Sequence, residues 1–154
     1  MWSAMGHTFT NHLYHVIFST KGRQPLVKSD IRDELYKYIC GVARKQHAVV
    51  IRVNGTADHV HLLIKVKPVT AVADVVRTIK ANSSKWLSET FPAMRGFQWQ
   101  PGYSSFTVSQ SAAGAVKEYI NGQEEHHRTR TFAEELKAFL DRHGVKYDAA
   151  HYLD

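Results

Sequence analysis

Apolar and polar residues recur along the chain with two different periods, and these periods predict the order of strands and helices. Alternating or β-branched apolar runs predict four strands, at residues 12–20, 48–53, 59–66 and 98–109. Apolar positions with i, i+3, i+4 spacing predict one helix that begins near Ser29 and another over residues 69–90. The predicted order is therefore β-α-β-β-α-β, followed by further helices.

This order predicts an α+β fold of the ferredoxin-like split βαβ type, in which a four-stranded antiparallel sheet carries two helices on one face. Asn54-Gly55 predicts a hairpin turn between the second and third strands. The second face of the sheet is then expected to be open for a ligand or another subunit. We expect one domain over residues 1–154, which divides into a core at about 8–110, a helix at about 111–127 and a tail helix at about 131–143 with a Thr131 capping box.

Two histidines lie on one face of the third predicted strand. Because successive residues of a strand point to opposite faces, His59 and His61 project side by side. Two neutral imidazoles held in this way can bind a divalent metal ion, although the pair alone also fits ordinary strand histidines. Asp58 either orients one imidazole or is simply a turn residue, and the sequence leaves both roles open.

A later segment brings a second set of reactive groups. Helical spacing from Ala113 to Gln123 places Tyr119 and Gln123 one turn apart on the same side. A tyrosine hydroxyl can be a covalent nucleophile and an amide oxygen can bind a metal, although a tyrosine on an apolar helical face is usually a core residue. His126 and His127 follow; because adjacent helical residues do not face the same way, at most one of them could join the site, and we expect both to face solvent or DNA.

The combination of Asp58-His59-Val60-His61 with Tyr119-x-x-x-Gln123 on a late helix resembles the single-tyrosine HUH transposases of the insertion-sequence 200/605 group. Their relatives associated with repetitive extragenic palindromes share the pattern. The segment from Thr10 to Arg23 is similar to the first strand and loop of these proteins, and residues 124–154 are similar to their C-terminal end. The resemblance therefore covers nearly the whole chain.

The resemblance implies a metal-dependent transposase that cleaves and rejoins single-stranded DNA at hairpin-bearing element ends. Tyr119 would be the catalytic nucleophile, forming a 5′-phosphotyrosine, and His59, His61 and Gln123 would bind Mg²⁺ or Mn²⁺. A homodimer is also implied, in which the family delivers the tyrosine helix in trans; the sequence leaves open whether Tyr119 acts in cis or in trans here.

The charge balance favours a polyanionic partner. Lys and Arg number 20 and Asp and Glu number 14, which gives a formal net charge of +6; such a surplus favours nucleic acid, although many basic proteins bind none. Candidate DNA contacts are basic or hydroxyl side chains of the second helix and the loops, namely Lys21, Arg23, Arg77, Lys80, Ser84, Lys85 and Arg128. Aromatic residues of the last strand, Trp99, Tyr103 and Phe106, either stack on unpaired bases or fill the buried face of the sheet.

Other features of the sequence limit the chemistry and the location. The single cysteine, Cys40, excludes an internal disulfide and a cysteine-rich zinc site. Because the sequence has neither a signal peptide nor 18 consecutive apolar residues, we expect a cytoplasmic, nucleoid-associated protein without a membrane partner. Met5 is a second candidate start of translation.

Two other functions remain open from the sequence. One is a domesticated HUH nuclease that cuts palindromic repeats without mobilising itself. The other is a non-catalytic nucleic-acid-binding module with the same sheet topology. Tyr119 discriminates the module from the transposase, because a binding module would tolerate Tyr119→Phe whereas the transposase would lose all strand cleavage.

Overall fold

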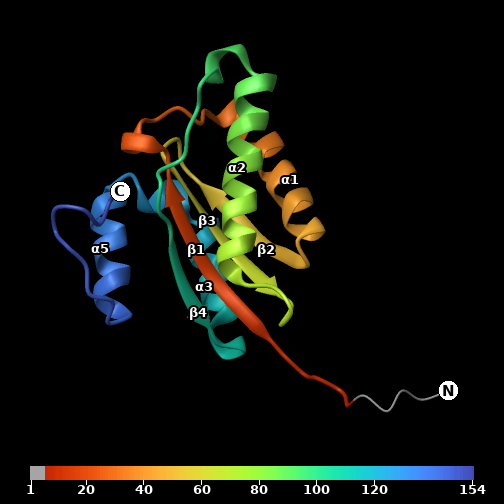
Figure 1. Ribbon diagram of the computed structural model, residues 1–154. Coiled ribbons are helices and arrows are strands. Elements are labelled where there is room, and N and C mark those ends of the chain that lie inside the picture. The colour runs from red at the N-terminus through yellow and green to blue at the C-terminus, as the bar shows by residue number, and fades with distance from the viewer. Residues whose placement is uncertain (1–5) are drawn as a thin grey trace.

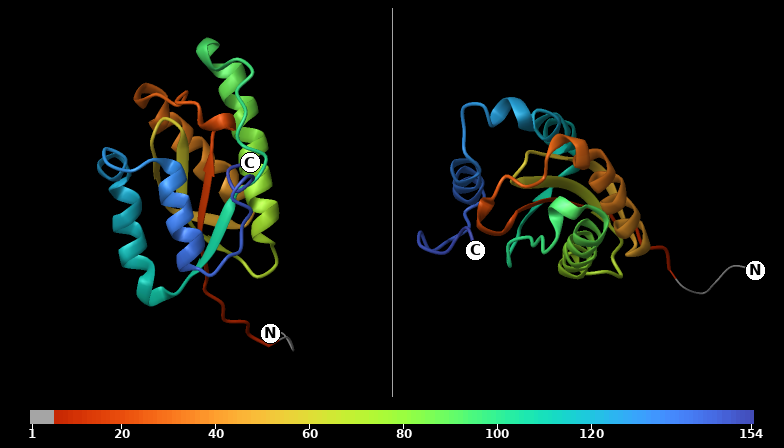
Figure 2. Two further views of the ribbon diagram at one scale, coloured as in Figure 1. Left: turned by 90° about the vertical axis from the view of Figure 1, so that its left-hand side faces the viewer. Right: turned by 90° about the horizontal axis from the view of Figure 1, so that it is seen from above.

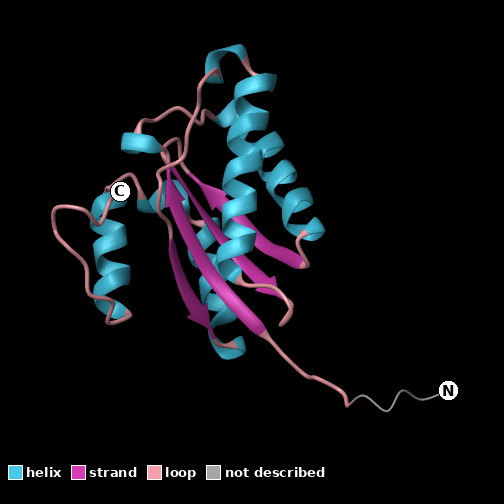
Figure 3. Cartoon of the chain, viewed as in Figure 1, coloured by secondary structure: helices cyan, strands magenta, loops and turns pink. Residues whose placement is uncertain are grey.

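The centre of the molecule is a four-stranded antiparallel sheet, seen in a computed structural model that describes residues 6–154. The candidate start Met5 lies outside the described residues. The strands are β1 (His12–Ser19), β2 (Ala48–Gly55), β3 (His59–Val66) and β4 (Ser104–Val108), and their order in the sheet is β2-β3-β1-β4 (Figures 1 and 3). This is the order of the ferredoxin-like split βαβ fold, so the predicted fold class is confirmed.

Helices α1 (Ser29–Lys45) and α2 (Val72–Thr90) cover one face of the sheet. Strands β1 and β3 direct Val16, Phe18 and Leu62 towards these helices, and all three side chains are fully buried. The helices contribute the apolar residues that their spacing predicted, including Leu35, Ile39, Val76, Ile79 and Leu87. Each such side chain contributes about 1.5–3 kcal/mol by its removal from water, so this face is the main core.

Three further helices, α3 (Ala113–Asn121), α4 (Gln123–His126) and α5 (Phe132–Arg142), cover the other face, and Figure 2 shows the sheet between the two layers. The prediction that this face is open is therefore wrong. Strand residues Leu13, Ile17 and Leu63 point to this side and would expose an apolar surface there. The apolar sides of α3 and α5 cover them, with Ile120, Leu136, Phe139 and Leu140 in the contact.

The connection between β2 and β3 also differs from the prediction. Asn54 and Gly55 belong to β2, and residues 56–58 make the turn. The Asn54 amide donates hydrogen bonds to the carbonyl oxygens of Ile120 (2.9 Å) and Asn121 (3.2 Å). Asn54 therefore fixes the end of α3 to β2, which explains why a residue typical of turns lies in a strand.

The predicted helix over residues 111–127 is interrupted at Gly122. Its backbone N–H donates to the carbonyl oxygens of both Glu118 and Tyr119, which closes α3, and α4 begins at the next residue. The tail helix begins as its capping box predicts, because Thr131 Oγ1 accepts a hydrogen bond from the Glu134 N–H at 3.2 Å. Short 3₁₀ turns lie at Lys21–Arg23, Pro92–Met94 and Gln110–Ala112. Within residues 6–154, no helix has the length and apolar character needed to cross a membrane.

Replacing Gly55 with alanine should destabilise the protein by about 1–3 kcal/mol, because the new Cβ would lie 2.1 Å from the backbone carbonyl oxygen of His59. Gly41→Ala is the matched control, because its Cβ would meet nothing within 4 Å. Gly41 lies inside α1, so the alanine should stabilise the helix by about 0.5–1 kcal/mol. Urea denaturation measures both. Equal stability of the Gly55→Ala variant and the unmodified protein would contradict the close approach of β2 to His59.

Candidate active site

Strand β3 brings His59 and His61 together on the face that α3, α4 and α5 cover. Their rings lie 5.1 Å apart between centroids, and both side chains are buried. Both belong to the regular antiparallel pairing of β3 with β1, in which His61 lies opposite Ile17 and His59 opposite Ser19. The side-by-side placement predicted from the i, i+2 spacing is therefore what the structure has.

The break at Gly122 does not separate Tyr119 from Gln123. Gln123 is fully buried, and its Oε1 lies 2.9 Å from His59 Nε2. The Tyr119 ring lies 5.8 Å from the His61 ring between centroids, within the same chain. The structure thus brings the four predicted site residues His59, His61, Tyr119 and Gln123 into one cluster.

Glu135 of α5 lies at the centre of this cluster, and sequence reasoning missed it. Its Oε1 lies 2.8 Å from His61 Nε2 and 3.5 Å from His59 Nε2. Its Oε2 accepts hydrogen bonds from the Tyr119 hydroxyl and from Gln123 Nε2. The sequence did carry a signal, because Glu135 lies on the apolar side of an amphipathic helix, three residues after Phe132 and four before Phe139, where a charge needs a buried partner.

His127 is the second residue that joins the cluster unexpectedly. Its side chain is 11% exposed and its Nε2 lies 3.2 Å from Glu135 Oε1, so the prediction that it faces solvent or DNA is wrong. The turn that follows α4 rotates His127 inward, and its Nδ1 is fixed by the carbonyl oxygen of Arg130 at 2.8 Å. Its buried Nε2 has no hydrogen-bond partner among the described residues. His126 stacks on the Tyr119 ring instead, 4.6 Å away between centroids.

Both strand histidines are oriented through their second ring nitrogen. Asp58 Oδ1 lies 2.7 Å from His59 Nδ1 and also accepts a hydrogen bond from the Thr56 hydroxyl, so Asp58 serves in the turn and orients the imidazole. His15 Nε2 lies 2.8 Å from His61 Nδ1. The sequence did not predict this role of His15, because the contact joins two neighbouring strands, β1 and β3. His12, the other histidine of β1, is exposed.

The buried charges shift the pKa values of these groups. Burial alone would raise the pKa of the Glu135 carboxyl, but its close contacts with the His127 and His61 imidazoles outweigh burial and hold that pKa far below its usual range. Burial, and next the hydrogen bond to Glu135, raises the pKa of Tyr119 well above 10.0. Glu135 is therefore a carboxylate and Tyr119 an uncharged phenol at neutral pH.

The donor set fits a bound cation. One ring nitrogen each of His59, His61 and His127 and one carboxylate oxygen of Glu135 all lie within 4.8 Å of one another, and the amide oxygen of Gln123 lies beside His59 Nε2. The two nitrogens of His59 both face oxygen atoms that carry no proton, Asp58 Oδ1 and Gln123 Oε1, so a neutral imidazole can satisfy only one of them. A divalent ion at the Nε2 side would satisfy this excess of lone pairs.

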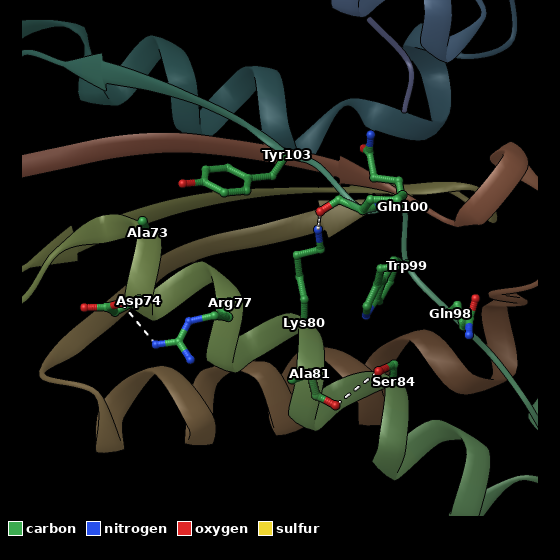
Figure 4. A pocket seen from close by; sticks show the side chains of 11 residues that line it. Ala73, Asp74, Arg77, Lys80, Ala81, Ser84, Gln98, Trp99, Gln100 and Tyr103 are labelled. Atoms are coloured by element: carbon green, nitrogen blue, oxygen red, sulfur yellow. Dashed lines mark hydrogen bonds and ion pairs between the residues drawn. The ribbon is translucent and has the colours of Figure 1, made fainter. Parts of the chain in front are cut away.

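The predicted DNA contacts are dispersed over the surface. Arg77, Lys80 and Ser84 border a cavity between α2 and residues 98–103 (Figure 4). Lys80 is engaged there, because its Nζ donates to the carbonyl oxygens of Pro101 (3.1 Å) and Gly102 (2.6 Å), and burial lowers its pKa to about 8.

The remaining predicted DNA contacts lie elsewhere on the surface, and three of these side chains contact other residues of the protein. Lys85 is exposed on α2, Lys21 donates to Gln98, Arg23 donates to the carbonyl oxygen of Leu153, and Arg128 pairs with Glu125 at 3.4 Å. Of the three aromatic candidates, Trp99 and Phe106 are buried, and Tyr103 is 39% exposed.

A family model described as IS200-like transposase matches residues 8–123. The chain belongs to the IS200-like transposase family. The matched residues include both strand histidines, Tyr119 and Gln123, whereas His127 and Glu135 lie beyond the match. Membership makes this protein a DNA transposase by family and confirms the resemblance found in the sequence.

Individual relatives agree with this assignment. The ISDra2 transposase TnpA of Deinococcus radiodurans is 29% identical over 115 residues, which cover 71% of this chain and 82% of the relative. The transposase for insertion sequence element IS200 of Salmonella typhimurium is 26% identical over 126 residues, which cover 78% of this chain and 82% of the relative.

Two solved structures share the fold. A crystal structure from Deinococcus radiodurans R1, described as that of a transposase, has a TM-score of 0.61 and 26% identity, and covers 80% of this IS200-like transposase and 98% of that chain. The REP-associated tyrosine transposase bound to a REP hairpin has a TM-score of 0.61 and 13% identity, and the match covers 82% of this chain and 74% of that chain.

The free energy of unfolding of the metal-free protein should fall as the pH decreases from about 6.5 to about 4. Burial is the main cause that lowers the pKa of His61 to about 4 and that of His15 to about 3, both from 6.5. The unfolded chain then binds more protons in this range, so stability rises with pH through it, and His61 alone contributes about 3 kcal/mol. Urea denaturation in the presence of a chelator measures this dependence.

His15→Phe should flatten the pH dependence because it removes one of the two titrating imidazoles, whereas the exposed control His12→Phe should leave it unchanged. An unmodified protein whose stability is the same at pH 6.5 and pH 4 would contradict the burial of neutral histidines.

Proposed function

We propose that this protein is a metal-dependent transposase that cleaves and rejoins single-stranded DNA at hairpin-bearing element ends through a 5′-phosphotyrosine. The observation that carries the proposal is the meeting of the Tyr119 hydroxyl, the His59 and His61 imidazoles and the Gln123 amide around one buried carboxylate. A tyrosine packed only for stability needs a hydrogen-bond acceptor for its hydroxyl. It does not need two imidazoles and an amide beside that acceptor. Family membership supports the same reading.

His59, His61 and Gln123 would hold the metal ion through Nε2, Nε2 and Oε1, with His127 and Glu135 within reach as further ligands. The ion, Mg²⁺ or Mn²⁺, would polarise the scissile phosphate and stabilise the charge that develops on it. Asp58 and His15 would keep the two strand imidazoles oriented through their Nδ1 atoms. These contacts would leave Nε2 of each ring free for the ion.

Tyr119 would be the nucleophile. Its Oη would bond to the phosphorus while the bond from phosphorus to the 3′-oxygen of the leaving strand breaks, and that oxygen takes up a proton from solvent. The hydroxyl proton has an acceptor in place, Glu135 Oε2. The site thus fixes the direction of the hydroxyl before DNA binds.

The covalent bond to Tyr119 would conserve the energy of the cleaved phosphodiester. A second 3′-hydroxyl could therefore attack the phosphotyrosine and rejoin DNA without ATP, which suits strand transfer rather than hydrolysis. The solved neighbour bound to a REP hairpin supports a hairpin substrate. The implied homodimer with trans delivery remains a prediction; in one chain, Tyr119 already meets the histidine cluster of its own β3.

Replacing Tyr119 with phenylalanine should abolish formation of a covalent protein–DNA adduct, because only the attacking oxygen is removed. The protein is incubated with single-stranded hairpin oligonucleotides from the DNA that flanks its gene, with Mg²⁺ or Mn²⁺, and the adduct is detected on a denaturing gel. The unmodified protein should form an adduct that a chelator prevents. Binding by the Tyr119→Phe variant should remain.

Tyr38→Phe is the matched control, because Tyr38 stacks on Trp86 on the other side of the sheet and should have no effect on cleavage. Binding of every flanking hairpin without any adduct, in either metal, would contradict the transposase mechanism and favour the non-catalytic binding module.

A further inference from the structure

We propose that a cavity beside Tyr119, between β4, α3 and α5, receives one unpaired nucleobase of the DNA strand next to the scissile phosphate. The inference rests on the proposed function, because it concerns the strand that Tyr119 would attack. The cavity has a volume of about 670 Å³. Tyr119 and His15 are both part of its wall, so it is continuous with the candidate active site.

The walls are suited to an aromatic guest. Phe106, Phe139 and Val116 line the cavity, and Phe106 and Phe139 lie near parallel, 5.8 Å apart between centroids. His143 lies parallel to Phe106, with its ring centroid 4.3 Å away. Phe106 and Phe139 are only 5% and 9% exposed, so they form the floor of the cavity, against which a base of any sequence can lie, and a volume of this size is ample for one base.

The rim supplies charge and hydrogen-bonding groups. Arg142 and His143 are exposed at one end of α5, and Ser109 follows β4 at the rim. The Arg142 guanidinium lies 5.5 Å from the centre of the Phe139 ring, at the edge of the aromatic wall. An apolar wall with a cationic rim matches a nucleotide, whose flat base is attached to an anionic phosphate.

A second cavity explains why the first one should take the base rather than the phosphate chain. It lies on the other side of the cluster, next to His127 and Asp58, and is lined by Arg32, Arg128 and Arg130. Arg32 is paired there with Glu124 and Arg128 with Glu125, so Arg130 is the arginine of this wall that has no ion pair among the described residues and can contact the sugar–phosphate backbone. A strand that crosses the site between the two cavities would place its phosphate at Tyr119 and a neighbouring base among Phe106, Val116 and Phe139.

The test combines removal of a base with filling of the cavity. Tyr119→Phe protein, which should bind DNA without cutting it, is titrated with the flanking hairpin oligonucleotide and with versions that carry one abasic nucleotide at each position around the cut. One abasic position should weaken binding about tenfold or more, because the stacked base is lost. The remaining positions in the single strand should have smaller effects.

Ala115→Phe fills the cavity from its exposed wall on α3, and Glu118→Phe adds the same ring to an exposed position of α3 outside the cavity. Ala115→Phe should weaken binding of the intact oligonucleotide by a similar factor. In this variant, the sensitive abasic position should then weaken binding no further. Glu118→Phe should behave as the parent protein. Thermal unfolding checks that both variants are folded.

Equal binding of all the abasic oligonucleotides would overturn the inference. So would a combination of the abasic site with Ala115→Phe in which the two losses of binding free energy are additive, because independent effects would mean that the base does not lie in the cavity. The proposed function is judged separately by the metal-dependent adduct in the unmodified protein. An adduct without base dependence refutes the cavity alone. Base dependence without an adduct supports the cavity and refutes the transposase chemistry.

Discussion

The buried carboxylate of Glu135 is the constraint around which this face of the molecule is arranged. A charge out of water is costly unless it is paired and hydrogen-bonded, and Glu135 meets this need with groups from three parts of the chain. His61 comes from β3, Tyr119 and Gln123 come from α3 and α4, and His127 comes from the turn before α5. Because each partner is fixed to a different element, the carboxylate determines how the late helices lie on the sheet.

The same constraint relates the fold to the proposed chemistry. The groups that satisfy Glu135 are the groups that would bind a cation and attack a phosphate, so the carboxylate holds the proposed reactive groups together. The orientation of the strand imidazoles does not depend on Glu135, because Asp58 and His15 contact their other nitrogens. The strand imidazoles are therefore oriented by the protein's own side chains, which is the preorganisation that the proposed metal-assisted chemistry would require.

Periodicity in the sequence predicted the part of the fold that local patterns control. The strand and helix order, the paired orientation of His59 and His61 and the Thr131 cap all depend on residues close in sequence. Glu135, His127 and His15 could not be placed in the same way, because their roles arise from contacts with other elements. The hairpin was also misread, since Asn54 serves a contact with α3 rather than a turn. The family match ends at residue 123 and so does not reach Glu135.

Anomalous X-ray diffraction from crystals soaked in Mn²⁺ tests the central claim most directly, because it locates the ion without relying on activity. The account predicts one strong peak bonded to Nε2 of His59, Nε2 of His61 and Oε1 of Gln123, close to the hydroxyl of Tyr119. A saturated crystal with no peak at these atoms, in which Glu135 still holds His61 and Tyr119, would contradict the account and leave the cluster as a structural feature of the fold.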